Sequence, residues 1–388
     1  TLHSLDSWGG AGPVASGSAV LRSVGGMQNQ AIMGWGTLNP EPSRGSFDFA
    51  TLDRRVALMR STGGTPVITV CCSPDWMKGG APGTTDWSKL EVAPTPDHFA
   101  DFAELARQVA LRYPDVHDYL VWNELKGFWN TPRNRFDYES YTVLYNDVYS
   151  ALKSVNPNIR VGGPYVPILS GTSASTMSHP SALRGSWGVI DQRSLDVVTY
   201  WRQHALGADF VAIDGSSASR SGNQFPDEYT ASAKLEAISG WVAQQTALPV
   251  WWSEWYVLPS GVDRIWGPQR RASVLADGLL HIMRGGGTTA LGWQPEADSS
   301  CEACLWTSTA VPGGGQMTPW ASALQEVVRP FHAGPPLLRA TASNTQVDVF
   351  ASPVDLLIVN RTGRALRVGV AQSVVTVPAY GVMRTATP

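Results

Sequence analysis

The sequence predicts a (β/α)8 barrel over residues 1–332, followed by a small β-sandwich over residues 333–388. Short apolar runs alternate with amphipathic helical stretches through most of the 388 residues. After about Gly334 the helical pattern stops and short alternating runs with turns between them take over. The glycine-rich segment 161–164 lacks the spacing of a phosphate-binding turn, so an open doubly wound sheet is the second choice.

The barrel strands are expected at seven short apolar runs, and an eighth is expected near residues 1–8. The seven runs are residues 30–36, 65–72, 117–123, 159–163, 208–214, 248–256 and 288–293. Strands that alternate with helices at this spacing pair in parallel, with helical crossovers between them. Eight such units favour a sheet that closes on itself.

The helices are expected where apolar residues recur with a 3.6-residue period. The clearest case is residues 138–155, where Tyr141, Tyr145 and Leu152 share one face. The same period occurs in residues 95–113, 228–246 and 271–285, and in a stretch that reaches about Val24.

Charge and hydropathy exclude two classes of partner. The formal net charge is −3 and no basic block is present, which argues against binding of nucleic acid. No apolar run reaches the roughly 18 residues that a bilayer-spanning helix needs. We therefore expect neither nucleic acid nor a membrane as partner.

The four cysteines do not match a zinc motif. Cys71 and Cys72 end an apolar run and are expected to be buried thiols. Cys301 and Cys304 could form a loop disulfide, a redox pair or half of a metal site. No second C-x-x-C and no H-x3-H accompany them, which favours the loop disulfide. A disulfide fits a secreted or extracellular protein, and we expect neither a metal nor a cofactor.

Two glutamates stand at the ends of expected strands, each beside aromatic residues. Glu124 follows YLVWN at the end of the fourth strand, and Glu254 lies in PVWWSEWY at the end of the seventh. Residues at the C-terminal ends of barrel strands converge on one mouth, so these carboxyl groups can face each other. Tryptophan rings at such a mouth suit the apolar faces of sugars.

Hydrolysis of a glycosidic bond needs a carboxyl pair of this kind. One carboxylic acid protonates the leaving oxygen, and the other carboxylate attacks the anomeric carbon or activates a water. Carboxyl groups about 5–5.5 Å apart give retention of configuration, and about 6.5–9.5 Å gives inversion. The acid must keep its proton near neutral pH, so we expect an apolar wall and the second carboxylate to raise its pKa.

The sequence around the two glutamates resembles that of glycoside hydrolase family 39. This family includes β-xylosidases, α-L-iduronidases and enzymes acting on arabinogalactan side chains. The run VWNELKGFW and the following YTVLYNDVYSALKSVNPNIRVGGP resemble its fourth strand, helix and fifth strand. PVWWSEWY resembles its nucleophile strand, and residues 46–53 and 65–77 resemble its second-to-third strand region. The resemblance implies a retaining barrel enzyme with Glu124 as acid/base and Glu254 as nucleophile. It also implies that Asn123 binds the hydroxyl next to the anomeric carbon.

The sequence departs from the family pattern at positions that would contact the hydroxyl groups of the sugar. Leu125 stands where the family has proline, and Asp214 stands near the place of its His-x-Tyr. Asp214 either contacts the sugar or satisfies the turn at Gly215. Glu296 either contacts the sugar or forms a structural ion pair, and Trp76 either lines the mouth or packs. The complete set of expected substrate contacts is Asn123, Trp35, Asn39, Trp76, Trp129, Tyr165, Asp214, Trp255, Tyr256, Trp293 and Glu296.

The sequence thus predicts a retaining glycosidase that acts on oligo- or polysaccharides. Side chains that contain xylose, galactose or L-arabinose are the leading substrates. A sugar-binding barrel without catalysis is one alternative. An inverting or transglycosylating enzyme of the same fold is another.

Overall fold

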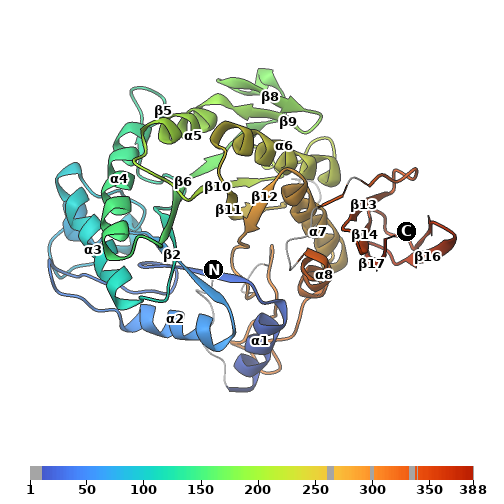
Figure 1. Cartoon of the computed structure of the whole chain (residues 1–388), viewed down its shortest axis with the longest axis horizontal. Coiled ribbons are helices and arrows are strands. Elements are labelled where there is room, and N and C mark those ends of the chain that lie inside the picture. The colour runs from blue at the N-terminus through green and yellow to red at the C-terminus, as the bar shows by residue number, and fades with distance from the viewer. Residues whose placement is uncertain (1–10, 260–265, 298–300, 332–336, 339, 388) are drawn as a thin grey trace.

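A curled parallel sheet surrounded by helices forms the main body of the protein (Figure 1). The computed structural model describes residues 11–259, 266–297, 301–331, 337–338 and 340–387. In spatial order the strands are β1 (Met27–Ala31), β2 (Thr65–Val70), β3 (Asp118–Val121), β6 (Arg160–Ile168), β10 (Phe210–Ser216), β11 (Val250–Tyr256) and β12 (Gly287–Ala290). This architecture confirms the predicted barrel class. The strand expected near residues 1–8 lies outside the described residues.

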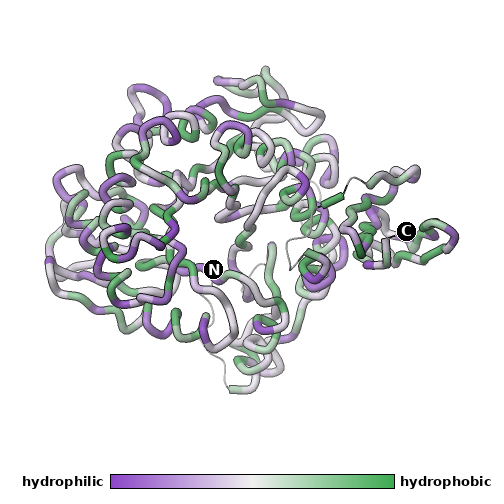
Figure 2. The backbone as a smooth tube through the Cα atoms, in the orientation of Figure 1, coloured by the Kyte–Doolittle hydropathy of each residue, from purple (hydrophilic) through white to green (hydrophobic). Residues whose placement is uncertain are grey.

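The helices connect successive strands and cover the outside of the sheet. They are α1 (Ala11–Val24), α2 (Ala50–Ser61), α3 (Phe99–Arg112), α4 (Tyr138–Val155), α5 (Gln192–His204), α6 (Glu228–Thr246), α7 (Pro268–Arg284) and α8 (Pro319–Val328). The helices expected over 138–155 and 228–246 are confirmed as α4 and α6. Apolar and polar positions interleave along the outer helices, as expected for helices with one buried face (Figure 2).

Helix α4 anchors the strand that precedes Glu124. The Asp137 carboxylate caps its N-terminus by accepting a backbone N–H from the first turn. Tyr141 is fully buried, and its hydroxyl donates a 2.9 Å hydrogen bond to the Val121 carbonyl at the end of β3. A Cβ at Gly163 would lie 2.6 Å from that hydroxyl oxygen, so glycine leaves the space that the tyrosine occupies. The end of β3 is therefore held from the helix side.

Several short strands elaborate the loops between these elements. They are β4 (Trp129–Asn130), β5 (Arg135–Phe136), β7 (Ser170–Gly171), β8 (Pro180–Gly185) and β9 (Gly188–Asp191). Among the described residues, no helix has both the length and the apolar character needed to cross a membrane.

The C-terminal strands form two antiparallel sheets beside α7 and α8 (Figure 1). One contains β13 (Val347–Ala351), β14 (Asp355–Asn360) and β17 (Val382–Ala386), and the other contains β15 (Leu366–Val370) and β16 (Ser373–Val377). Apolar residues from both sheets share one core, which fits the expected sandwich. The expected domain boundary at 332/333 stays a prediction, since residues 332–336 are outside the described ranges.

Both cysteine pairs form disulfides. The Cys301–Cys304 bond confirms the expected loop disulfide. The expectation of two buried thiols at Cys71 and Cys72 is wrong, because these buried residues are bonded to each other. Strand β2 ends at Val70, so the two side chains no longer alternate between opposite faces of the sheet. The disulfides fit the expected export of the protein, which stays a prediction.

Candidate active site

Glu124 sits in a left-handed stretch of backbone directly after β3. Trp122, Glu124 and Leu125 have φ angles of 69°, 47° and 48°, a region that non-glycine residues seldom adopt. The indole N–H of Trp122 donates a 2.7 Å hydrogen bond to the Lys126 carbonyl, and the Lys126 N–H donates to the Asn123 carbonyl at 3.0 Å. These bonds hold the strained turn, which aims Glu124 at the other acidic groups of the site.

A β-bulge in β11 aims Glu254 at the same place. Trp251 belongs to the core inside the barrel, and Trp252 belongs to the core between sheet and helices. Trp252 pairs with Ile213 of β10, and Glu254 pairs with the next residue, Asp214. Ser253 is therefore the extra residue of the bulge, which re-aims the side chains that follow it.

A second bulge, in β6, places Tyr165 against Glu254. Pro164 pairs with Ala212 and Val166 pairs with Ile213, so Tyr165 is the extra residue of the bulge. Its buried hydroxyl donates a 2.6 Å hydrogen bond to Glu254 Oε1. The hydroxyl of Tyr256 donates a short hydrogen bond to the other oxygen, Oε2. Both oxygens of Glu254 are thus held in a fixed orientation.

Asp214 is a third acidic group between the two glutamates. One carboxylate oxygen from each of Glu124, Asp214 and Glu254 lies within 4.8 Å of the others. Asp214 and Glu254 are each 3% exposed, while the side chain of Glu124 is 19% exposed. Oδ1 of Asp214 is buried and has no hydrogen-bond partner among the described residues. The structure thus brings together the predicted pair and adds Asp214 to it, and the expected sugar contact of Asp214 stays a prediction.

The pKa values of the three carboxyl groups follow burial and nearby charge. Burial and the charge of Glu124 raise the pKa of Glu254 to about 7, against the hydrogen bonds of Tyr165 and Tyr256. Burial raises the pKa of Asp214 well above its usual range, and the hydrogen bond with Glu124 adds to this. Burial also acts to raise the pKa of Glu124, but its hydrogen bond with Asp214 and the Lys126 ammonium outweigh burial and lower it.

The expectation that the pKa of Glu124 is raised is therefore wrong for the free protein. The apolar wall is present, but a cation and a hydrogen-bond donor contact the group directly, and direct contacts favour its ionised form. Asp214 is the more deeply buried of the two hydrogen-bonded groups. Asp214 therefore holds the proton and donates the hydrogen bond, and Glu124 accepts it.

Lys126 is a site residue that sequence reasoning missed. Its ammonium Nζ lies 2.6 Å from Glu124 Oε2 and donates a 2.6 Å hydrogen bond to Glu91 Oε1. The sequence signal was a lysine two residues after the glutamate. A lysine ammonium therefore engages Glu124, and two tyrosine hydroxyls engage Glu254.

Glu254 opens onto a narrow pocket. The pocket is lined by Asn29, Gln30, Ala31, Trp35, Thr69, Asn123, Tyr165, Glu254 and Trp293. Trp35 and Trp293 meet edge to face there, with ring centroids 5.7 Å apart. About 10 Å³ is left for water-sized molecules, which is room for about one water. A sugar ring at this place requires the two indoles to separate.

Three polar residues of this pocket were not expected from the sequence. Asn29 and Gln30 are buried in β1, and the Thr69 hydroxyl of β2 donates a 2.9 Å hydrogen bond to Asn29 Oδ1. A run such as MQNQA within a strand was the available signal, because polar residues inside a barrel need hydrogen-bond partners. Their polar groups line the pocket together with Asn123.

Two expected substrate contacts lie elsewhere. Trp255 is 2% exposed and packs edge to face on Trp320 of α8, because the bulge before it turns it to the helix side of the sheet. The buried Glu296 accepts hydrogen bonds from the Thr309 N–H and hydroxyl at 2.6 Å and from the Trp306 indole at 3.2 Å. The placement corrects both expectations: Glu296 holds a loop with neutral donors, and neither residue lines the pocket.

Three other expected contacts also lie outside the lining of the pocket. The Asn39 side chain bonds to Thr85 at 3.1 Å and to the backbone N–H of Glu41 at 3.0 Å. The Trp76 indole donates to the Glu41 carbonyl at 2.8 Å, which matches the packing alternative for this residue. Trp129 is 42% exposed on the β4–β5 hairpin, and its contact with substrate stays a prediction.

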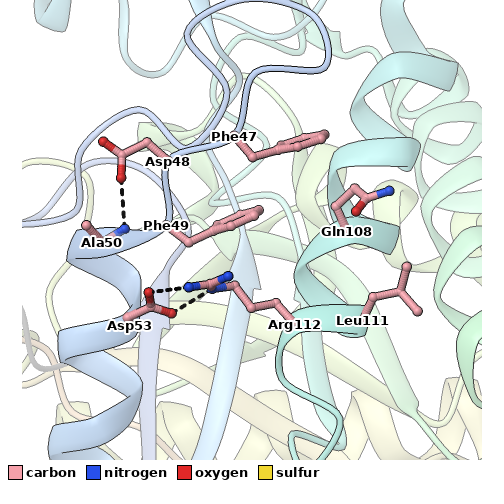
Figure 3. Close-up of a pocket in the computed structure, with 8 residues that line it drawn as sticks. All are labelled: Phe47, Asp48, Phe49, Ala50, Asp53, Gln108, Leu111 and Arg112. Atoms are coloured by element: carbon pink, nitrogen blue, oxygen red, sulfur yellow. Dashed lines mark hydrogen bonds and ion pairs between the residues drawn. The ribbon is translucent and has the colours of Figure 1, made fainter.

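A larger groove lies between α2 and α3 (Figure 3). Its volume is about 590 Å³, and the stacked rings of Phe47 and Phe49 lie along it. Arg112 forms a bidentate ion pair with Asp53 across the groove, at 2.7 and 2.5 Å. Of the two carboxylates that line the groove, Asp53 is paired with Arg112 and Asp48 accepts the Ala50 N–H at 2.9 Å.

A protein-family model matches the part of the chain that carries this site. The sequence model described as "Glycosyl hydrolases family 39" matches residues 36–261, which contain Glu124, Asp214 and Glu254. No curated protein sequence matches the chain significantly.

Solved structures share the fold at low sequence identity. SrfJ from Salmonella typhimurium has a TM-score of 0.62 at 11% identity, covering 98% of this chain and 85% of its own. The bacterial orthologue of human α-L-iduronidase has a TM-score of 0.59 at 12% identity, and the match covers 91% of this chain and 62% of that protein. A monomeric β-xylosidase from Caulobacter crescentus CB15 has a TM-score of 0.51 at 15% identity, and the match covers 81% of this chain and 62% of that protein. The chain therefore spans less than two thirds of the length of the last two proteins.

The family match confirms the resemblance inferred from the sequence. It covers more than half of the 388 residues and includes the strand ends that carry the three acidic groups. The protein therefore belongs to glycosyl hydrolases family 39, a family of retaining glycosidases.

Proposed function

We propose that the protein hydrolyses glycosidic bonds with retention of configuration, with Glu254 as nucleophile and Glu124 as acid/base. The observation that carries this proposal is the approach of their carboxylate oxygens to within 4.8 Å. That distance fits the spacing of about 5–5.5 Å in retaining enzymes better than the 6.5–9.5 Å of inverting ones. The pocket beside Glu254 supplies the amide of Asn123 and two indole rings for one sugar ring.

The reaction proceeds in two displacements. A Glu254 oxygen attacks the anomeric carbon while Glu124 gives its proton to the glycosidic oxygen, and the aglycone leaves. A water then loses a proton to Glu124 and attacks the same carbon, which releases Glu254. Tyr165 and Tyr256 hold the Glu254 carboxylate for attack. Asp214 holds a proton at hydrogen-bond contact with Glu124 and supplies it to that group before the first step.

The proposed substrates are oligo- or polysaccharides with xylose, galactose or L-arabinose in their side chains. Support comes from family membership and from the β-xylosidase among the structurally similar proteins. The test is a panel of aryl glycosides and plant polysaccharides, with the first-formed product anomer identified by NMR. Retained configuration supports the proposal, and inversion contradicts it. Binding without turnover across the panel would indicate a sugar-binding barrel instead.

Replacing Lys126 with methionine should move the alkaline limb of the pH profile of kcat/KM to higher pH. The ammonium, 2.6 Å from Glu124, favours the ionised carboxylate and lowers the pKa of Glu124. Its removal therefore raises that pKa, and Glu124 keeps its proton to higher pH. Lys89→Met is the matched control, because Lys89 pairs with Asp86 at 3.4 Å on the surface. An alkaline limb that stays in place, or moves to lower pH, contradicts the role given to Lys126.

Replacing Asp214 with asparagine should lower kcat about 100-fold, the range expected for a lost proton-transfer group. The amide can still donate a hydrogen bond to Glu124, but it cannot supply a proton. Steady-state kinetics on a hydrolysed glycoside measure the effect, and circular dichroism checks the fold. Turnover close to that of the unchanged protein would show that Asp214 only orients Glu124.

A further inference from the structure

A second cluster of potential metal ligands lies where α7 meets the C-terminal sheets. Asp277 and His281 are one helical turn apart on α7, and Asp348 lies on β13, beside that helix in Figure 1. One ligand atom from each of the three lies within 4.8 Å of the others. The distance from His281 Nε2 to Asp277 Oδ2 is 3.7 Å.

The inner atoms of this cluster are buried and unsatisfied. Asp277 is 0% exposed and His281 is 6% exposed. Both carboxylate oxygens of Asp277 and Nε2 of His281 lack hydrogen-bond partners within the described part of the chain. A buried carboxylate is costly unless it is protonated, paired or bound to a metal, so Asp277 needs a proton or a positively charged partner.

Glu236 sets the tautomer of His281. Nδ1 of His281 lies 2.7 Å from Glu236 Oε2, and a carboxylate accepts hydrogen bonds, so Nδ1–H is the donor. In the neutral ring this leaves the lone pair on Nε2, which faces Asp277. A carboxylate that orients a histidine through its far nitrogen is the usual arrangement around histidine-bound metals.

The neighbouring arginines are engaged elsewhere. Arg361 forms an ion pair with Asp348, and Arg284 lies 3.7 Å from Glu236 and donates to the Val349 carbonyl at 3.1 Å. Within the described ranges, the basic side chain within 4 Å of the Asp277 carboxylate is the imidazole of His281, at 3.7 Å. The two arginines therefore pair with Asp348 and Glu236, which leaves a proton or another cation as the partner of Asp277.

We propose that Asp277, His281 and Asp348 bind a divalent cation of the zinc type, which ties α7 to the C-terminal sheet. One imidazole nitrogen and two carboxylate oxygens suit zinc, whereas calcium takes six to eight oxygens. Ligands about 2.1 Å from a tetrahedral zinc lie about 3.4 Å apart. The observed 3.7 Å between His281 and Asp277 reaches that value after a shift of a few tenths of an ångström.

This proposal departs from the expectation drawn from the sequence, which was that the protein binds no metal. That expectation rested on cysteine pairs and H-x3-H spacing. The available signal was Asp277-x3-His281, which places two ligands on one helical face. The third ligand, Asp348, lies 67 residues after His281 in the sequence, so local spacing does not reveal it.

The experiment is zinc titration of the purified, chelator-treated full chain by calorimetry, with metal content measured by mass spectrometry after dialysis. We expect one zinc ion per chain, a Kd of about 1 μM or tighter, and a Tm raised by about 5 °C at hundredfold excess over Kd. Cobalt in the same site should give the visible absorption of a tetrahedral centre.

Four variants locate the site. Asp277→Asn and His281→Gln each remove a ligand and should weaken binding about 100-fold or more, and Glu236→Gln should weaken it about tenfold. His98→Gln is the matched control, because His98 also bonds through Nδ1 to a carboxylate, that of Asp101 at 2.7 Å, and should not change binding. If Asp277→Asn does not fold, the His281 and Glu236 variants decide.

The alternative for the same atoms is a proton shared between Asp277 and Asp348, without a metal. Absence of zinc and cobalt binding in the micromolar range supports that alternative and overturns the proposal. Binding that persists unchanged in His281→Gln also overturns it, since the metal would then lie elsewhere. The readouts measure metal and stability, so they do not depend on the proposed glycosidase activity.

Discussion

Replacing Glu254 with glutamine is expected to lower kcat about 10⁴-fold or more, which corresponds to about 5 kcal/mol of lost transition-state stabilisation. Glutamine has nearly the same size, and its amide oxygen still accepts a hydrogen bond from Tyr165 or Tyr256. The barrel should therefore fold, while the group that attacks the anomeric carbon is lost. Steady-state kinetics on the best glycoside of the panel measure the loss.

Glu296→Gln is the matched control for this experiment. Glu296 is a buried glutamate of the same barrel, but its oxygens accept hydrogen bonds from Thr309 and Trp306. Its replacement should lower the Tm, because buried donors lose part of their acceptor, and should leave kcat within a few fold. If the folded Glu254→Gln protein turned over at a near-normal rate, Glu254 would not be the nucleophile.

Replacing Glu124 with alanine is expected to lower kcat about 10³- to 10⁴-fold on glycosides with poor leaving groups. Added azide should restore turnover on an activated aryl glycoside and yield a glycosyl azide of retained configuration. Azide fits the space left by the carboxylate and needs no general base, so it replaces the water of the second displacement. NMR of the product identifies its anomer.

Glu254→Ala is the counterpart that distinguishes the two roles. Azide can then occupy the place of the nucleophile and attack the substrate directly, which gives a glycosyl azide of inverted configuration. The comparison matters because the free protein shows a lowered pKa at Glu124 and a pKa of about 7 at Glu254. Retained product from Glu254→Ala and inverted product from Glu124→Ala would exchange the two assignments.

In the free site the pKa of Glu124 is lowered and that of Glu254 is raised, the reverse of what the proposed acid and nucleophile need. The proposal therefore requires that substrate binding change the order of these two pKa values. Lys126 contacts Glu124 directly, and Asp214 carries the proton that Glu124 needs. A sugar ring that separates Trp35 from Trp293 would also exclude water from the three acidic groups, which strengthens their mutual repulsion. Transfer of the proton from Asp214 to Glu124 leaves the number of negative charges among the three groups unchanged, so this repulsion does not by itself drive the transfer.

The sequence alone determined the barrel class, the bounds of α4 and α6, and the strand ends that carry Glu124 and Glu254. Periodicity is a local property, and parallel strands in a barrel necessarily present their C-terminal ends at one mouth. The loop disulfide of Cys301 and Cys304 also followed from local spacing. The family was identified from the sequence around the two glutamates, and the family match confirms it.

The tertiary structure alone decided which side chains face each other. The bulge at Ser253 turns Glu254 inward and Trp255 outward, and the bulge at Tyr165 brings its hydroxyl to Glu254. One extra residue reverses the alternation of every side chain after it, and the sequence pattern of a short strand carries no mark of that reversal. The contact of Asp214 with Glu124 depends in the same way on the register between strands.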